Sequence, residues 1–193
     1  MSKAAACALG LLMLAGCAAP SEQAGTEATT TTQREEEAPQ EPTEETEPEA
    51  EAGDRESPFP MNRSWHVSDE WAVNVLGTTP NANAAVQKEN QFNDPPAEGN
   101  QFFMVNVEIT YQGEGSGSRF LSLQFGVAGS DNKIYSENED GCGVTPNGLS
   151  QNKELLTGGS DSGNICFEVP SEVVDSLLLA VNAYGDNYFF ALL

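Results

Sequence analysis

Alternation of apolar and polar residues with a period of two is the feature that most limits how this chain can fold. In FFMVNVEITYQG, residues 102–113, apolar side chains occupy every second position from Phe103 to Tyr111, and the positions between them are mostly polar. A strand with one face in a core gives this pattern, whereas an amphipathic helix repeats its apolar residues every three or four positions. The C-terminal part of the chain is therefore predicted to consist of β-strands.

Other stretches follow the same rule and are separated by turns rich in Gly, Asn, Asp and Ser. In FLSLQFGV the pattern predicts an inward side chain at every second position from Leu121 to Val127. In GNICFEVP it predicts the same from Ile165 to Val169, which turns Cys166 to the opposite face. Short strands without long helical periodicity favour an all-β, antiparallel β-sandwich.

The N-terminus has the organisation of an exported lipoprotein. Lys3 precedes an apolar run that is too short to span a bilayer, and the run ends in Leu14-Ala15-Gly16-Cys17. This ending resembles a bacterial lipobox, which implies a signal peptide over residues 1–16 and a diacylglycerol group on Cys17. An ordinary signal peptide that contains a cysteine is the alternative. Two acyl chains would anchor the protein to the cytoplasmic membrane at its extracytoplasmic face.

The segment that follows, residues 17–57, is predicted to be a disordered acidic tether. It holds 13 Asp or Glu against two Arg, several Pro and Thr, and no aromatic residue. Such a composition cannot bury enough apolar surface to offset the entropy of ordering the chain. We interpret it as a solvated spacer, with a binding tail as the alternative.

Residues 58–193 have the length of a single domain, and this domain is itself acidic, with 17 Asp or Glu against five Lys or Arg. A nucleic-acid-binding protein needs a basic stripe, so nucleic acid is excluded as an expected partner. Direct docking on anionic lipid headgroups is disfavoured for the same reason. Basic partners and bound cations remain open.

The two cysteines of this domain, Cys142 and Cys166, are predicted to form a disulfide. Outside the cytoplasm an even pair is typical of a structural bond. A redox-active pair is the alternative, but the sequence has neither a C-x-x-C motif nor a basic neighbour that would lower the pKa of a thiol.

No catalytic motif stands out, so we do not expect an enzyme, a cofactor or a metal centre. The sequence has a single histidine, His66, and no G-x-S-x-G motif that would supply a nucleophilic serine for it to activate. Zinc ligands are also scarce. Carboxylates gather at Asp131, Glu137, Glu139 and Asp140, and Asp161 lies in another loop, but they lack the spacing of a calcium loop. Extracytoplasmic cation (calcium) binding or sensing is the alternative function, and a cell-wall glycan hydrolase with two carboxylates is a weaker one.

The loop FNDPPAEG, residues 92–99, is the stretch that we single out for binding. Two consecutive prolines stiffen it, and an exposed Phe92 beside Asn93 and Asp94 would make a contact site. In the alternative reading, which we favour, Phe92 closes one end of the sandwich and the prolines only fix a turn.

Two stretches of the domain also carry a family resemblance, NQFNDPPAEGNQFFMVNVEITYQG (90–113) and LLTGGSDSGNICFEVP (155–170). They resemble the extracytoplasmic lipoprotein domains of Gram-positive bacteria, chiefly actinobacteria, known as domain-of-unknown-function family 4352. The resemblance implies an immunoglobulin-like sandwich, shared with a small secreted mycobacterial antigen, and a location outside the cell membrane. It supplies no catalytic residues. Antibody-type domains have a tryptophan between their two cysteines, and this chain has none between Cys142 and Cys166.

Taken together, the sequence leads us to expect a membrane-anchored envelope lipoprotein that presents a non-enzymatic immunoglobulin-like binding domain. The expected partners are the membrane, through the lipid on Cys17, and an envelope protein. A purely structural spacer is the remaining alternative.

Overall fold

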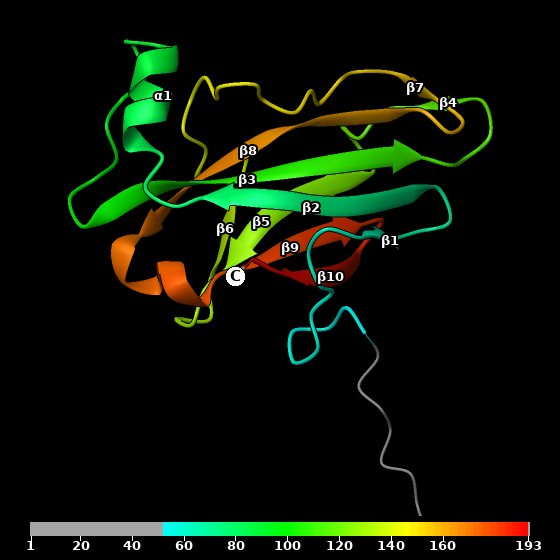
Figure 1. The fold of residues 1–193 in the computed structure, drawn as a ribbon, viewed down its shortest axis with the longest axis horizontal. Helices are drawn as coiled ribbons and strands as arrows, with labels where there is room; N and C mark the ends of the chain where they lie inside the picture. The colour runs from blue at the N-terminus through cyan, green and yellow to red at the C-terminus, as the bar shows by residue number, and fades with distance from the viewer. Residues whose placement is uncertain (1–51, 193) are drawn as a thin grey trace, which may run out of the picture. The chain divides into compact units, whose positions relative to one another are not determined.

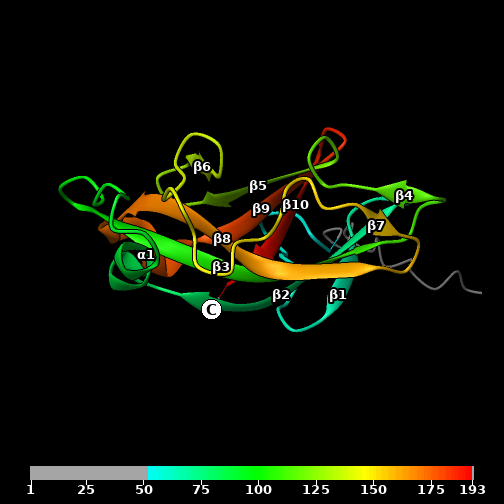
Figure 2. The same cartoon turned by 90° about the horizontal axis from the view of Figure 1, so that it is seen from above.

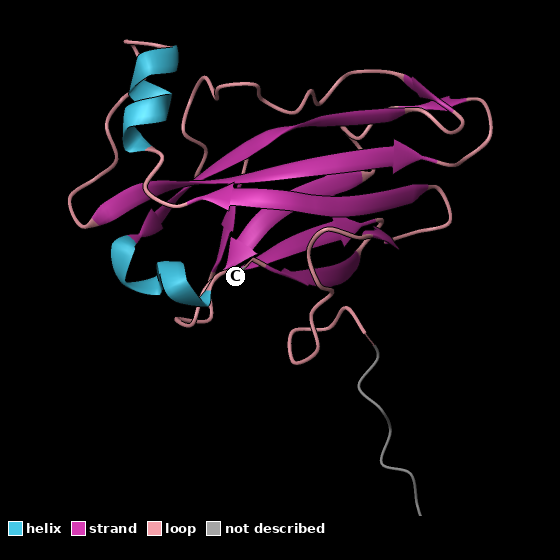
Figure 3. Cartoon of the chain, in the orientation of Figure 1, coloured by secondary structure: helices cyan, strands magenta, loops and turns pink. Residues whose placement is uncertain are grey.

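The computed structural model describes residues 52–192. The expected signal peptide (1–16), the lipidation site Cys17 and most of the expected tether lie outside the described residues. Residues 52–192 form two antiparallel four-stranded sheets packed face to face, with two short helices beside them (Figures 1 and 3). The prediction of an all-β, antiparallel sandwich is confirmed. Within the same residues, no helix is both long and apolar enough to cross a membrane.

Each sheet joins strands that are distant in the sequence, and Figure 2 shows the two layers from above. The first sheet has the order β1 (Ser64–His66), β2 (Trp71–Thr79), β3 (Asn100–Tyr111), β8 (Ser160–Pro170). The second has the order β10 (Asp186–Ala191), β9 (Leu178–Ala183), β5 (Leu123–Ala128), β6 (Ile134–Ser136). A small ribbon pairs β4 (Ser116–Gly117) with β7 (Leu155–Leu156), and the helices are α1 (Asn83–Glu89) and the 3₁₀ helix η1 (Ser171–Ser176).

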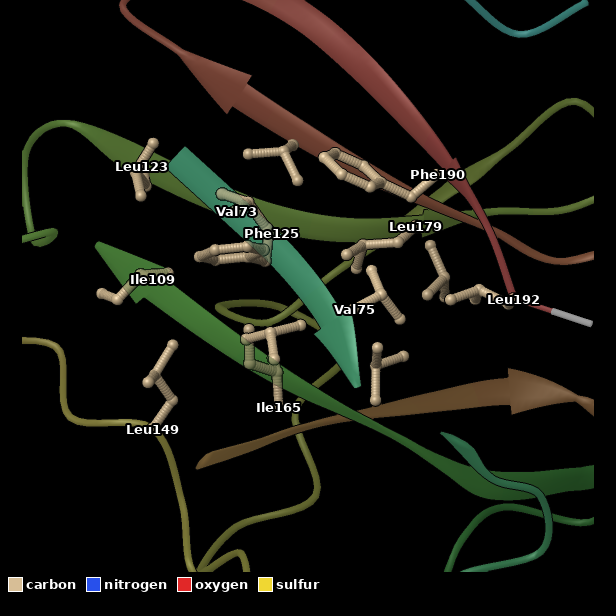
Figure 4. Close-up of a cluster of buried hydrophobic side chains, with 14 of the residues drawn as sticks. Val73, Val75, Ile109, Leu123, Phe125, Leu149, Ile165, Leu179, Phe190 and Leu192 are labelled. Atoms are coloured by element: carbon tan, nitrogen blue, oxygen red, sulfur yellow. The ribbon is translucent and has the colours of Figure 1, made fainter. Parts of the chain in front are cut away.

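The core lies between the two sheets and contains the residues that the alternation predicts (Figure 4). On β3, the side chains from Phe103 to Ile109 at every second position are at most 2% exposed. From β5, Leu123 and Phe125 enter the same core. Burial of such side chains removes apolar area from water and is the main favourable term in folding.

The prediction for Leu121 is wrong, because this side chain is 83% exposed. Strand β5 begins only at Leu123, and the backbone N–H groups of Ser122 and Leu123 both donate to the carbonyl oxygen of Arg119. The residues before the strand therefore form a tight turn, and a turn does not continue the alternation of a strand.

A second, smaller apolar cluster lies on the outer face of the first sheet. Phe102, Met104 and Cys166 point to this face and are covered by Val86 of α1 and by Cys142. The predicted outward direction of Cys166 is thereby confirmed. The cluster explains why α1 docks here, since its one buried apolar residue needs a partner surface.

Ordered contacts begin at Gly53, ahead of the boundary at residue 58 that composition indicates. The Gly53 carbonyl oxygen accepts a hydrogen bond from the Phe189 N–H, and the Arg55 guanidinium donates to the Gly129 carbonyl oxygen at 2.8 Å. Backbone groups can pair with an edge strand whatever the side chains are, so composition does not reveal such contacts.

Candidate functional site

The loop that the sequence singled out follows α1 and is fixed by Asn93. This side chain is 8% exposed. Its amide nitrogen donates to the carbonyl oxygens of Val86 at 3.1 Å and Val144 at 2.8 Å, and its Oδ1 accepts from the Val144 N–H at 2.9 Å. Asn93 therefore joins the end of α1 to the loop that carries Cys142. Gly143 must remain glycine here, because its φ is +79° and a Cβ atom would lie 2.5 Å from Asn93 Oδ1.

Phe92 points away from the protein and is 83% exposed. The favoured interpretation, in which Phe92 closes the end of the sandwich, is wrong, because Asn93 occupies the buried position and the adjacent side chain is left outside. Asp94 is exposed as well. Val144, on the other side of the Asn93 hydrogen bonds, is 51% exposed. We call Phe92 and Val144 the loop patch.

A disulfide joins Cys142 to Cys166, as predicted, with their Cα atoms 5.6 Å apart. Both half-cystines are 4% exposed. The bond ties the long loop between β6 and β7 to the edge strand β8. Backbone hydrogen bonds from Leu149 N–H to the Asn164 oxygen and from Glu168 N–H to the Asp140 oxygen hold the same loop along this strand. An otherwise open sheet edge is thereby covered.

Sequence reasoning missed a buried ion pair beside this loop. The Arg119 guanidinium donates to both carboxylate oxygens of Glu137, at 2.8 and 3.1 Å, and their side chains are 3% and 9% exposed. Arg119 also donates to the carbonyl oxygens of Leu149 and Ser150. In the sequence Glu137 is only one of several carboxylates in the same stretch, and nothing in the spacing of Arg119 and Glu137 indicates that they meet.

A polar cavity of about 260 Å³ lies at this place and is lined by the ion pair, the disulfide, Asn164 and the loop backbone. Its charged side chains and Asn164 already have partners. Arg119 and Glu137 satisfy each other, and the Asn164 amide donates to the Pro146 carbonyl oxygen while accepting from Asn106. The cavity can therefore offer shape and hydrogen bonds to a ligand, but it holds no free acid–base pair.

Of the other carboxylates singled out in the sequence, Glu139 is exposed and the remaining three have separate partners. Asp131 accepts a hydrogen bond from the Tyr135 hydroxyl, Asp140 accepts from the Ser136 N–H, and Asp161 pairs with Lys153. Over residues 52–192, no three His, Cys, Asp or Glu side chains converge in a way that could hold a metal ion. His66 is exposed on the edge strand β1.

The Tyr135–Asp131 hydrogen bond gives a pH-dependent prediction. Burial, followed by the bond to Asp131, raises the pKa of Tyr135 to about 12 from an ordinary value of 10.0. The same bond lowers the pKa of the Asp131 carboxyl. The interaction thus stabilises the fold below pH 10 and is lost as the pH rises through 12, and on the acid side it is lost as Asp131 protonates.

We expect an ultraviolet titration to show a tyrosine that ionises near pH 12 and is absent from Tyr135→Phe. In Asp131→Asn its midpoint should move down towards 10, because the anionic acceptor is gone. An unchanged midpoint in Asp131→Asn would contradict the assignment.

Two solved structures are similar to this chain. One is a conserved hypothetical protein from Bacillus anthracis, which is 15% identical, has a TM-score of 0.43 and covers 69% of this chain and 95% of its own. The other is an uncharacterized β-sandwich protein from Clostridium difficile 630, which is 14% identical, has a TM-score of 0.44 and covers 75% of this chain and 98% of its own. No protein-family model and no curated protein matches the chain.

Of the three residues predicted for binding, the structure leaves Phe92 and Asp94 accessible and uses Asn93 to position them. Nothing in the sequence indicates Val144, which lies 51 positions from Asn93 and is connected to the loop by the Asn93 hydrogen bonds. An exposed aromatic side chain on a fixed loop is suited to contact another molecule and not to proton transfer.

Proposed function

We propose that this chain is a cell-envelope lipoprotein, anchored through a diacylglycerol on Cys17, whose immunoglobulin-like domain binds an envelope protein without catalysing a reaction. The lipobox-like Leu14-Ala15-Gly16-Cys17 supports the anchor. The acidic composition of residues 58–193 argues against nucleic acid and anionic lipid as the bound partner.

The observation that carries the proposal is the fixed but fully presented Phe92. An aromatic ring that is 83% exposed leaves most of its apolar surface in contact with water, and its neighbour Asn93 is held by three hydrogen bonds to the backbone of Val86 and Val144. A loop that is already ordered loses little entropy when it binds. Aromatic residues in such positions are typical anchors of protein–protein contacts.

Quantitative cross-linking mass spectrometry on intact cells tests the proposal. Lys88, at the exposed end of α1, lies near the loop patch and is an acceptor for amine-reactive cross-linkers. We expect one envelope protein to link through Lys88 and to be lost in Cys17→Ser, which cannot be acylated. Phe92→Ser should reduce these links strongly at equal protein level. Asn93→Ala should reduce them as well, although the ring is retained.

Leu156→Ser is the matched control, because Leu156 is 72% exposed but belongs to β7. It should leave the Lys88 links unchanged. Links that do not depend on Phe92, or that disappear equally in Leu156→Ser, would contradict a binding role for the loop patch. An N-terminal peptide without acyl groups, measured by mass spectrometry, would contradict the anchor.

A further inference from the structure

A second exposed apolar group lies far from the loop patch, in the turn just before β5. Phe120 is 55% exposed and Leu121, next to it, is 83% exposed. Tyr184, in the hairpin between β9 and β10, is 59% exposed, and its hydroxyl oxygen lies within hydrogen-bond distance of Ser122 Oγ, at 3.2 Å. Figure 2 shows the turn and the hairpin side by side. We call Phe120, Leu121 and Tyr184 the apolar tip.

The turn that presents the tip is held from inside the protein. Both Ser122 and Leu123 donate their backbone N–H to the Arg119 carbonyl oxygen. The Arg119 side chain is fixed by Glu137 and lies over the ring of Phe125, 5.3 Å from its centroid. Two consecutive apolar side chains thus lie on an ordered turn, and this turn would lose little conformational entropy on binding a partner.

Tyr184 adds a conformational argument. It has φ +51° and is followed by Gly185 with φ +105°, in a hairpin whose strands pair at Ala183 and Asp186. Asn or Gly is favoured at the first position of such a turn, and an aromatic residue is strained there. The tyrosine hydroxyl has a partner in the fold, because it donates a hydrogen bond to the Glu70 carboxylate. The ring is retained at a position where the backbone favours another residue.

The surroundings of the tip are acidic. Asp69 and Asp186 are exposed beside it, and Glu70 accepts the Tyr184 hydrogen bond. Of the neighbouring bases, Arg119 is buried against Glu137 and Lys153 pairs with Asp161. A surface of this kind disfavours anionic lipid and favours a partner with positive charge around its contact.

The tip also lies at the other end of the sandwich from the loop patch. The loop patch adjoins the start of β3, whereas Glu70 bonds Gln112 just past the end of this strand, which at 12 residues spans about 36 Å.

From these observations we propose that the apolar tip is a second docking surface, and that its partner is a protein with an apolar surface, such as one face of a helix, bordered by lysine or arginine. Phe120 and Leu121 pack against this apolar surface, and the surrounding carboxylates face the basic border. This proposal goes beyond the binding role of the loop patch. Either surface can fail its test while the other passes, because the two tests measure different ends of the domain.

A defined peptide can act as a probe of this chemistry. We would titrate a labelled amphipathic helix, with leucines on one face and lysines on the other, against the full chain in phosphatidylcholine nanodiscs and subtract empty nanodiscs. The double variant Phe120→Ser/Leu121→Ser should raise the dissociation constant about tenfold or more, because it removes two apolar anchors. Tyr184→Asn, which suits the backbone, should raise it about threefold or more. Binding should weaken as salt rises.

Ile134→Ser is the matched control, since Ile134 is 55% exposed, as Phe120 is, but lies on β6. It should leave peptide affinity unchanged. Equal loss in Ile134→Ser, or equal binding of a peptide with glutamate in place of lysine, would overturn the proposal. So would Phe120- and Leu121-dependent retention of the nanodisc-held chain by phosphatidylglycerol vesicles, which would make the tip a membrane contact. Melting temperatures confirm that each variant folds.

Discussion

Replacing Glu137 by leucine is expected to lower the free energy of unfolding by about 3–5 kcal/mol. Leucine fills much of the volume of the glutamate but leaves the Arg119 guanidinium, whose side chain is 3% exposed, without its carboxylate. Taking a charge out of water costs several kcal/mol when nothing compensates it. The carbonyl oxygens of Leu149 and Ser150 would still accept from Arg119, but they carry no full charge.

The double variant Arg119→Met/Glu137→Leu separates the energy of the pair from the cost of breaking it. Well-packed apolar residues often replace a buried ion pair with little loss, so the double variant should be more stable than Glu137→Leu alone. Asp161→Asn is the control for an ion pair with an exposed cation. It leaves Lys153 unpaired, but Lys153 is 54% exposed and can be hydrated, so the substitution should cost no more than about 1 kcal/mol. Urea unfolding curves measure all four proteins. A double variant as unstable as Glu137→Leu would show that the packing volume, and not the unpaired charge, dominates.

The sheets could be predicted because their information is local. Every second residue of β3 enters the core, so one stretch of sequence defines both the strand and its buried face. The same argument succeeds at Cys166 and Ile165, which point to opposite sides of β8. It fails at Leu121, where two hydrogen bonds to the Arg119 oxygen end the alternation before β5 begins.

The candidate site could be predicted only in part, because its contacts are long-range. The loop with Phe92 was recognised from its prolines, but the direction of the ring depends on Asn93, whose partner Val144 is 51 positions away. The pairing of Arg119 with Glu137 depends on the path of two loops. The periodicity of the sequence does not indicate the path of a loop. A carboxylate in an acidic loop has the same sequence context whether it is solvated or buried.

The apolar tip illustrates the opposite limit of sequence reasoning. The alternation predicts that Leu121 is the first inward residue of a core strand, and its position in a turn makes it a surface residue beside Phe120. An apolar pair is informative when it is exposed, since apolar residues in general fill the core. The structure therefore places on the surface a residue that the alternation assigns to the core.

Removing the disulfide is the second large change that we expect. Replacing both Cys142 and Cys166 by alanine should lower the free energy of unfolding by about 3–4 kcal/mol, as the chain-entropy treatment gives for a loop of about 25 residues. Alanine keeps the small apolar volume at the outer face of the first sheet, so the change acts mainly on the unfolded chain. Reducing the wild-type protein should produce nearly the same loss, and the alanine variant should not respond to reductant.

The loss should be concentrated where the bond acts. The Val144 N–H, which donates to Asn93, and the Leu149 N–H, which donates to Asn164, should exchange with solvent faster in the alanine variant than in the wild type. Amides in the middle of β3 should change only by the global destabilisation. Uniform acceleration would mean that the loop and the sandwich unfold as one unit. Selective acceleration at Val144 would show that the disulfide keeps Asn93, and with it the exposed ring of Phe92, in a fixed position. In that case binding through the loop patch should weaken on reduction although the sandwich stays folded.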